Sequence, residues 1–380
     1  MPEGEKPYRV YRGGRVKGRV PVEAREPKSR EATPGSHEPK RTRVTWRRAL
    51  RWTALALGVV ILASVVWGIL GFLSFRQGVQ DANARLPKSA SKQLSDRSAS
   101  FLSEPTNTLV VGTDGGGGRG KGNDRSDSLM LVRTDSRTHR ISYLSIPRDL
   151  RVEIPGFGTS KINAANQYGG PALTIATVRR LTGLPIDHVV VVDFDDFREL
   201  IDAIGGVEVK VPRPILSNKF DCPYKAARCA AWPGWRFEKG LQHMDGRRAL
   251  VYSRIRKNQL DPADTDISRT ERQQAVAAAV ADKLASLGTF LRLPFVGDSL
   301  AAPLTTDLGA WQFVQLGWVH LRSGGNELHC RLGGDPTTIG GESVLIGSED
   351  NAAVISMFTG RTTPQPPPKG SLYGPGCPKR

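Results

Sequence analysis

The chain has 380 residues, of which 39% are hydrophobic and 24% are charged, and this composition excludes a wholly disordered or fibrous protein. The length admits one large domain or two small ones. The formal net charge of +17 suggests an anionic partner such as nucleic acid, a lipid surface or phosphates.

The N-terminal segment, residues 1–51, is strongly basic, with fifteen Lys and Arg against six Glu. It is rich in Pro and Gly and lacks apolar periodicity, so it is predicted to be a disordered cytoplasmic tail. A solvated tail that helps to set the membrane topology is the favoured interpretation. Binding of anionic lipids or nucleic acid is the alternative.

Residues 52–75 form an uncharged, mostly apolar run of 24 residues. At about 1.5 Å per residue such a helix rises roughly 36 Å, enough to cross a bilayer core of about 30 Å. A cleaved signal peptide is disfavoured because its apolar core is normally shorter. Arg47, Arg48 and Arg51 precede the run, and positive charges stay on the cytoplasmic side. The run is therefore predicted to be a single transmembrane anchor, with the N-terminus inside and the rest of the chain outside.

The remaining chain is predicted to hold a polar stalk (76–106), a large domain (107–360) and a loose Pro- and Gly-rich tail (361–380). Alternating strand and helix patterns predict an α/β domain, a sheet covered by helices on its faces. Strands are expected at 108–112, 128–134, 139–146, 188–194, 207–211, 327–332 and 342–346. Helices are expected at 171–183, from 194 to Gly205, and at 245–254, 266–287, 307–322 and 350–358.

Four cysteines are present, and none forms a C-x-x-C pair, which argues against a zinc ribbon. Cys222 and Cys229 flank a short insertion, and their spacing predicts a local disulfide if the domain lies in an oxidising compartment. Free thiols are the alternative. A bridge between Cys330 and Cys377 is the further expectation.

A glycine-rich stretch follows the first predicted strand of the domain. Gly115, Gly120 and Lys121 match the spacing of a phosphate-binding P-loop. Gly122 stands where that motif needs Ser or Thr, however, and a strand rather than a helix is predicted next. A flexible surface loop at 115–123 is therefore favoured over a nucleotide site.

The two ends of this loop carry carboxylates, because Asp114 ends one predicted strand and Asp127 begins the next. Adjacent strand ends can bring two carboxylates together. Two hard oxygen ligands, with waters and a substrate phosphate, satisfy magnesium. Solvation and capping of the loop is the alternative interpretation.

Basic and polar residues gather at three further places. One group follows a predicted strand, one ends a predicted helix, and the third begins the next helix, where residues four apart share a face. Because an arginine fork matches phosphate oxygens and stays charged, the set indicates a metal-bridged pyrophosphate; taken singly, each is more often a surface residue. The three groups are Arg148 with Asp149, Arg254 with Arg256, and Asp266 with Arg269 and Gln273; Arg125, two residues before Asp127, joins them.

Other site chemistries find no support. The six histidines lack metal-ligand spacing, and there is no G-x-S-x-G motif and no Cys–His pair.

Seven segments together resemble the LytR–CpsA–Psr family of bacterial membrane-anchored enzymes, across residues 107–287, in the family's order and spacing. The Arg- and Ala-rich composition resembles that of actinobacterial members. Members transfer a phospho-glycan from a polyprenyl-pyrophosphate carrier to a hydroxyl of peptidoglycan. The segments are NTLVVGTD, RSDSLMLV, LSIPRD, KINAANQYGG, DAIGGVEV, MDGRRALVYSRIR and DTDISRTERQQ.

The resemblance implies roles for the candidate residues. It implies that Asp114 and Asp127 hold Mg²⁺ (or Mn²⁺). It implies a mixed sheet between helix layers, with an apolar pocket for the lipid tail. Asp149, Asp266 and Arg269 match further motif positions among the catalytic residues. The pyrophosphate is expected to be bound by Arg125, Arg148, Arg254, Arg256 and Gln273.

Three features depart from the family pattern. The loop between the two aspartates is slightly long, Ser268 replaces the usual Gly and is expected to shift Arg269, and the Cys222–Cys229 insertion is not general.

The resulting hypothesis is extracytoplasmic transfer of a phospho-glycan to peptidoglycan, which attaches a secondary wall polymer, with Asp149 or Asp127 as candidate general base. A pyrophosphatase that releases the lipid-linked glycan to water is the alternative at the same site. A membrane-bound regulator resembling a transcriptional attenuator is the alternative of another class. It is disfavoured because the basic tail lacks a helix-turn-helix pattern.

Overall fold

The computed structural model describes residues 46–95, 100–115, 125–262, 264, 266–367 and 375–377, with only the backbone described at 266 and 267. The chain divides into two units, residues 1–56 and 57–380. The predicted disordered tail lies outside the described residues as far as residue 45. Its last part, 46–51, is helical instead, because the first helix already begins at Trp46.

The described helices match most of the predicted ones, but the short helices α2 and α5 and the longer α8 were not predicted. Helix α8 contains Pro294 and two glycines, residue types that usually interrupt helices. The helices are α1 (Trp46–Ala84), α2 (Lys88–Ser91), α3 (Ala164–Thr182), α4 (Phe194–Ala203), α5 (Ala226–Ala231), α6 (Gly246–Arg254), α7 (Asp266–Leu284), α8 (Leu287–Ala301), α9 (Ala310–Ser323) and α10 (Asn351–Phe358).

The described strands form one large mixed sheet, one smaller sheet and two strand pairs. The large sheet has the order β11 (Thr305–Thr306), β6 (His188–Asp193), β1 (Thr106–Thr113), β2 (Ser126–Asp135), β3 (Arg140–Ile146), β12 (Glu327–Arg331). The smaller sheet has the order β13 (Gly334–Ile339), β14 (Glu342–Gly347), β4 (Leu150–Ile154), β5 (Gly158–Lys161). The pairs are β7 (Val207–Val211) with β10 (Gly240–Met244), and β8 (Ile215–Leu216) with β9 (Arg236–Phe237).

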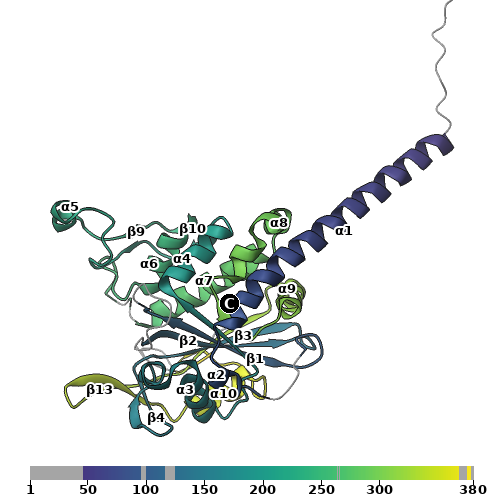
Figure 1. Cartoon of the computed structure of the whole chain (residues 1–380). Coiled ribbons are helices and arrows are strands. Elements are labelled where there is room, and N and C mark those ends of the chain that lie inside the picture. The colour runs from purple at the N-terminus through teal and green to yellow at the C-terminus, as the bar shows by residue number, and fades with distance from the viewer. Residues whose placement is uncertain are drawn as a thin grey trace, which may run out of the picture. The chain divides into compact units, whose positions relative to one another are not determined.

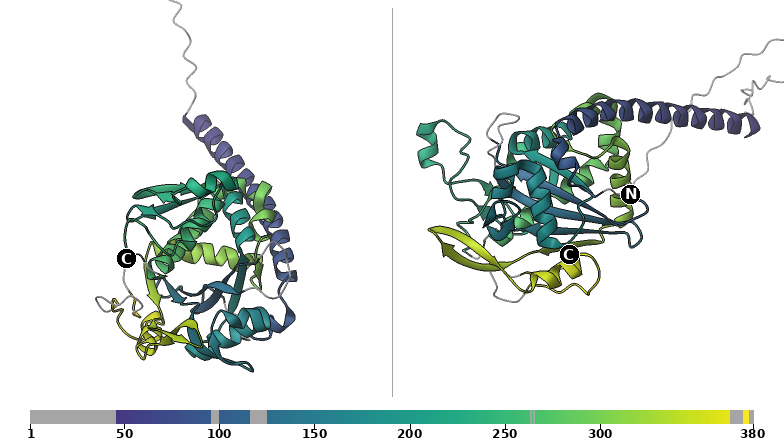
Figure 2. Two further views of the ribbon diagram at one scale, coloured as in Figure 1. Left: turned by 90° about the vertical axis from the view of Figure 1, so that its left-hand side faces the viewer. Right: turned by 60° about the horizontal axis from the view of Figure 1, so that its bottom comes forward.

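Helices cover both faces of the large sheet, which confirms the predicted α/β/α arrangement (Figure 1). Along β1, Leu109 and Val111 point to the face covered by α2, α3 and α10, and they are fully buried in the main core there. Val110 points to the opposite face, because successive side chains of a strand alternate. Helices α4, α6, α7 and α9 lie on that second side (Figures 1 and 2).

Local sequence signals explain where the helices near the site begin and end. Asp193 caps α4 by accepting a hydrogen bond from the Asp196 backbone N–H at 2.7 Å, and Asp245 caps α6 in the same way through Arg248 at 2.7 Å. Gly205 follows α4 with φ +79°, the left-handed backbone that glycine adopts readily. Both helix boundaries agree with the predicted ones.

The predicted stalk is wrong, because described residues of 76–106 pack into the domain. Helix α1 continues to Ala84 without interruption, and Val79, Ala82 and Ala90 are buried. Phe101 is also fully buried, with Leu308 and Val319. The polar residues of this segment occupy the exposed side of an amphipathic helix, so the sequence pattern looked like a solvated linker.

The C-terminal tail is also partly ordered, contrary to the prediction. Cys377 is buried and forms a disulfide with Cys330 on β12, and Gly376 pairs with Arg331. The other predicted disulfide, between Cys222 and Cys229, is present as well. Both expected bridges are therefore confirmed.

Candidate active site

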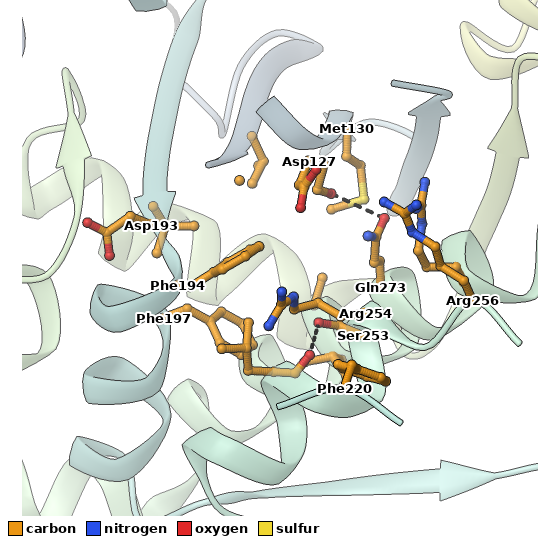
Figure 3. Close-up of a pocket in the computed structure, with 18 of the residues that line it drawn as sticks. Asp127, Met130, Asp193, Phe194, Phe197, Phe220, Ser253, Arg254, Arg256 and Gln273 are labelled. Carbon is orange, nitrogen blue, oxygen red and sulfur yellow. Dashed lines mark hydrogen bonds between the residues drawn. The ribbon is translucent and has the colours of Figure 1, made fainter. Parts of the chain in front are cut away.

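A cavity of about 360 Å³ lies between the second face of the large sheet and helices α4, α6 and α7 (Figure 3). Its inner wall is apolar and comes from strands β1, β2 and β6 together with α4, α6 and α7. Such a pocket, with a few convergent polar groups, is the usual form of a small-molecule site. The apolar lining residues are Val110, Met130, Val192, Phe194, Phe197, Phe220, Leu250, Val276 and Ala277.

Polar and charged side chains form the other part of the lining. Asp127 and Ser128 come from β2, Arg254 ends α6 and Arg256 follows it, while Arg269 and Gln273 come from α7. Five of the predicted site residues therefore line one cavity: Asp127, Arg254, Arg256, Arg269 and Gln273. They come from segments as far apart as 127 and 273, and the tertiary structure unites them.

A bulge in β2 places Asp127 at the cavity. Gly112 pairs with Ser128, but the next residue, Thr113, pairs with Ser126, so Asp127 is the extra residue. A bulge interrupts the in-and-out alternation of a strand and re-aims a side chain, often beside an active site. Here Asp127 and its neighbour Ser128 both line the cavity.

Arg148 reaches Asp127 from the turn that follows β3. Its Nη1 forms an ion pair with the Asp127 carboxylate, and its Nε lies 3.4 Å from Asp149 Oδ2. Lys161 Nζ lies 3.9 Å from the other Asp149 oxygen. Positive and negative groups therefore alternate from Lys161 to Asp127, and Arg148 and Asp149 adjoin the cavity through Asp127 without lining it.

Arg254 is held by two aromatic rings and one carboxylate. Its guanidinium carbon lies 4.4 Å from the centroid of the Phe194 ring and 5.8 Å from that of Phe220. Such cation–π contacts contribute about 0.5–2 kcal/mol each. Nη1 also pairs with Asp221, which lies between Phe220 and the disulfide-bonded Cys222. The fork of Arg254 is thus pre-oriented at the cavity, as Figure 3 shows.

Helix α7 presents Gln273 and Arg269 on one face, as their spacing predicts. The Ser128 hydroxyl donates to Gln273 Oε1 at 3.2 Å, which joins α7 to β2 across the cavity. Arg269 is only 8% exposed, so its charge stands in surroundings with little water to screen it. A charge in such a place attracts an anion more strongly than one on the open surface.

A buried ion pair fixes α7 beside the end of α6. Arg272 Nη1 donates to both oxygens of the fully buried Asp264, at 2.9 and 3.1 Å, and Nη2 donates to the Ile255 backbone carbonyl. Removal of one partner from such a pair costs about 3–5 kcal/mol, because the other charge stays buried. Arg272 therefore positions the segment that carries Arg254 and Arg256.

Ser268, the predicted departure from the family pattern, has its own partner. Its side chain is buried, and its hydroxyl accepts a hydrogen bond from Arg213 Nη2 at 3.1 Å. Arg213 Nη1 in turn pairs with Asp261 at 2.7 Å. The hydroxyl thus ties the start of α7 to the segment before it, and the next residue, Arg269, still lines the cavity.

Besides Arg148 and Asp149, two predicted site residues, Asp114 and Arg125, do not line the cavity. Asp114 is exposed just beyond β1, and Arg125 is exposed before β2 with its Nε donating to Gln167 Oε1 at 3.0 Å. Both flank residues 116–124, which lie outside the described part of the chain. The side chain of Asp266 also lies outside the described residues, as do Gly120 and Lys121 of the disfavoured P-loop.

Sequence reasoning missed the aromatic wall and the acidic partner of Arg254. Phe194 and Phe197 lie three residues apart on one face of α4, and Phe220 precedes Asp221 and Cys222. The signal for the first pair was their helical spacing directly after a strand, where ligands often bind. The signal for Asp221 was its place beside a cysteine of the insertion.

The magnesium site at Asp114 and Asp127 stays a prediction. Thr113 and Ser126 pair across the two strands, and the Asp114 backbone N–H donates to the Arg125 carbonyl at 3.4 Å, so Asp114 and Asp127 leave adjacent strand ends. Among the described residues no group of three His, Cys, Asp or Glu side chains could hold a metal ion. Magnesium needs only one or two carboxylates when water and phosphate supply the rest.

Residues 72–357 match the sequence profile of the LytR_cpsA_psr family. The chain belongs to this family. It is 31% identical over 257 residues to the polyisoprenyl-teichoic acid–peptidoglycan teichoic acid transferase TagU of Bacillus mycoides (strain KBAB4). That match covers 67% of this chain and 77% of the relative. The predicted family is thereby confirmed.

Solved structures share the fold. The crystal structure of Bacillus subtilis TagV aligns with a TM-score of 0.55 and 28% identity, over 68% of this chain and 96% of that one. A structure of TagT bound to LIIa-WTA aligns with a TM-score of 0.54 and 26% identity, over 70% and 94% of the two chains. The chain therefore shares the fold of these structures over about 70% of its length.

Proposed function

We propose that this chain transfers a phospho-glycan from a polyprenyl-pyrophosphate carrier to a hydroxyl of peptidoglycan. The single observation that carries the proposal is the composition of one cavity, an apolar inner wall with guanidinium groups at its polar side. A lipid pyrophosphate has the matching chemistry, an apolar chain joined to a doubly phosphorylated head. The relative TagU is named for the same class of transfer.

Each part of the donor has a place in the cavity. The apolar chain packs against Phe194, Phe197 and the strand residues of the inner wall. Arg254, Arg256 and the nearly buried Arg269 neutralise the pyrophosphate oxygens, because guanidinium groups bind phosphate bidentately and do not lose their charge. Gln273 donates a further hydrogen bond through its amide nitrogen.

The reaction is a phosphoryl transfer. The acceptor hydroxyl oxygen attacks the glycan-side phosphorus, and the bond from that phosphorus to the bridging oxygen breaks. Lipid monophosphate leaves, and the hydroxyl proton passes to a carboxylate, Asp127 or Asp149. Catalysis of this kind consists mainly of positioning and charge stabilisation, which the arginines supply.

A divalent cation fits beside these residues. Asp127 and Asp114 hold it in this proposal, with water and phosphate oxygens as the remaining ligands. When bound, Mg²⁺ or Mn²⁺ supplies positive charge to the phosphate oxygens. Arg148 shares the Asp127 carboxylate and so sets its orientation.

The domain lies outside the cytoplasm in this proposal, with the N-terminus inside. Helix α1 is long and apolar enough to cross a membrane, and Arg47, Arg48 and Arg51 stand at its N-terminal end. Two disulfides support the same orientation, because such bonds persist in oxidising compartments.

The test measures glycan transfer from a lipid-pyrophosphate donor to peptidoglycan by the full chain in membranes. Asp127→Ala and Arg254→Ala are each expected to lower kcat by about 10²–10³-fold, the usual loss when one electrostatic stabiliser is removed. Arg180→Ala is the matched control, because Arg180 pairs with Glu153 on the exposed surface. Wild-type rates in both site variants would contradict the assignment.

The same assay distinguishes the alternative reactions. A transferase releases lipid monophosphate only when the glycan acceptor is present, whereas a pyrophosphatase releases it into water without an acceptor. Deletion of residues 1–45 tests the regulatory alternative, in which the basic tail carries the function. Unchanged wall-polymer attachment after the deletion would confine the function to the folded domain.

A further inference from the structure

Helices α8 and α9 each carry a stripe of exposed apolar side chains, and none of these side chains lines the cavity. On α8, Leu287, Leu291 and Phe295 follow one another at intervals of four residues, so they form one stripe along the helix. Leu287 is 71% exposed and Phe295 is 74% exposed. Large apolar residues in such a stripe are normally buried against another surface.

Helix α9 carries a second stripe of the same kind. Trp311, Val314, Trp318 and Leu321 are spaced by three or four residues and therefore share one face. Trp311 and Leu321 are each 61% exposed. We call the two stripes together the α8–α9 face: Leu287, Leu291, Phe295, Trp311, Val314, Trp318 and Leu321.

The α8–α9 face adjoins the apolar helix α1. The rings of Trp67 and Phe295 lie 5.5 Å apart, edge to face, and the rings of Phe75 and Phe313 lie 5.5 Å apart in the same geometry. Helix α1 thus contacts both helices within residues 67–75, the C-terminal part of the apolar run, where Figures 1 and 2 show it beside them. The apolar surface of α1 therefore meets the α8 stripe at Phe295, and α9 packs against the same helix through Phe313.

Glycines make this contact close. A Cβ atom at Gly78 of α1 would lie 2.1 Å from the Asp298 backbone oxygen, and one at Gly297 of α8 would lie 2.7 Å from the Phe75 backbone nitrogen. These separations are shorter than any van der Waals contact, so only glycine allows the two backbones to approach. The position of α8 along α1 is therefore fixed by backbone packing.

We propose that the α8–α9 face rests in the surface of the same bilayer that α1 crosses. This inference depends on α1 being a membrane anchor and not on the transfer reaction. The occupant is lipid because the face continues from the apolar surface of α1. The residue types agree, since tryptophans gather at membrane–water interfaces and Arg322, with its guanidinium carbon 5.8 Å from the Trp318 ring centroid, suits the headgroup region.

The consequence concerns the donor. Helix α8 packs against α4 and α7, which both line the catalytic cavity. With the α8–α9 face in the bilayer surface, the domain is held at the lipid headgroups instead of being displaced from them on a linker. A lipid-linked substrate then reaches the cavity over a short distance.

The test uses the full chain, labelled with 5-fluorotryptophan and placed in lipid nanodiscs that contain a headgroup nitroxide. Fluorine resonances are assigned with Trp311→Phe and Trp318→Phe. The signals of Trp311 and Trp318 are expected to lose most of their intensity through paramagnetic broadening. Those of Trp232 and Trp235, which lie near the disulfide-closed insertion, serve as internal controls and are expected to keep theirs.

A double variant supplies the second arm. Leu291→Glu with Leu321→Glu places charges on the face and is expected to restore both tryptophan signals, while α1 keeps the chain in the disc. Leu241→Glu is the matched control, because Leu241 is 70% exposed on β10 and its substitution is expected to leave the broadening unchanged.

Two outcomes would overturn the proposal. If Trp311 and Trp318 respond no more than Trp232, the face stands in water. If the fluorine signals of Trp311 and Trp318 change only in discs that hold two chains, a second copy covers the face and lipid does not. Neither readout depends on glycan transfer, so failure of the proposed function leaves this test intact.

Discussion

At the scale of single residues, Asp221 is the least expected part of the site. It pairs with Arg254, a residue assigned here to the pyrophosphate, although the pair is partly exposed, at 42% and 30% of the two side chains. A phosphate that binds Arg254 must compete with this carboxylate or approach beside it. Asp221 therefore acts as an internal counter-ion that lowers the attraction of Arg254 for anions.

We predict that removal of this carboxylate tightens the binding of the lipid-pyrophosphate donor. Asp221→Asn is expected to lower the KM for the lipid-pyrophosphate donor about 1.4- to fivefold, because an exposed ion pair contributes about 0.2–1 kcal/mol. Steady-state kinetics measures the change, and Glu153→Gln, which removes the surface partner of Arg180, is the control. A raised KM would mean that Asp221 positions Arg254 instead of competing for it.

At the scale of elements, the two disulfides have different roles, one near the cavity and one in the stability of the fold. Cys222–Cys229 closes a short loop, with a sequence separation of 7, beside Phe220 and Asp221 at the cavity. Cys330–Cys377 spans 47 residues and joins β12 to the C-terminal segment. The first acts close to the site, and the second restrains a longer stretch of the unfolded chain.

Variants in which both cysteines of one disulfide are replaced by serine are predicted to separate these two roles. Loop-closure entropy gives about 2.5 kcal/mol for the short loop and about 4 kcal/mol for the long one. Cys330→Ser with Cys377→Ser should therefore cause the larger loss in the free energy of unfolding, measured by denaturant titration in detergent. Cys222→Ser with Cys229→Ser should cause the larger loss in kcat/KM. The reverse order in either measurement would contradict this division.

The longest element that sequence patterns failed to predict is α8. Its residues are apolar on nearly every side and include Pro294, so no amphipathic period marks it as a surface helix. It forms because α1 packs closely along Gly297 on one side and the domain lies on the other. The predicted stalk was wrong for a different reason, because its polar residues cover the exposed side of a helix whose other side, with Val79 and Ala82, is buried.

At the scale of the whole molecule, the charges around α1 predict its orientation. Proteinase K added to intact spheroplasts is expected to remove a C-terminal tag and to spare an N-terminal tag, because Arg47, Arg48 and Arg51 favour the cytoplasmic side. Immunoblots of both tags measure the result, and detergent-permeabilised cells, in which both tags are cut, are the control. Loss of only the N-terminal tag would reverse the assignment.

The sequence by itself determined the apolar run of α1, most strands of the large sheet, the caps of α4 and α6, and the family. These features depend on residues close together in the chain, whose periodicity and capping chemistry act locally. Only the tertiary structure decided that Asp127, Arg254 and Gln273 share one cavity, that a bulge re-aims Asp127, and that Asp221 pairs with Arg254. Contacts between distant segments depend on how strands pair and helices pack, and no local pattern encodes them.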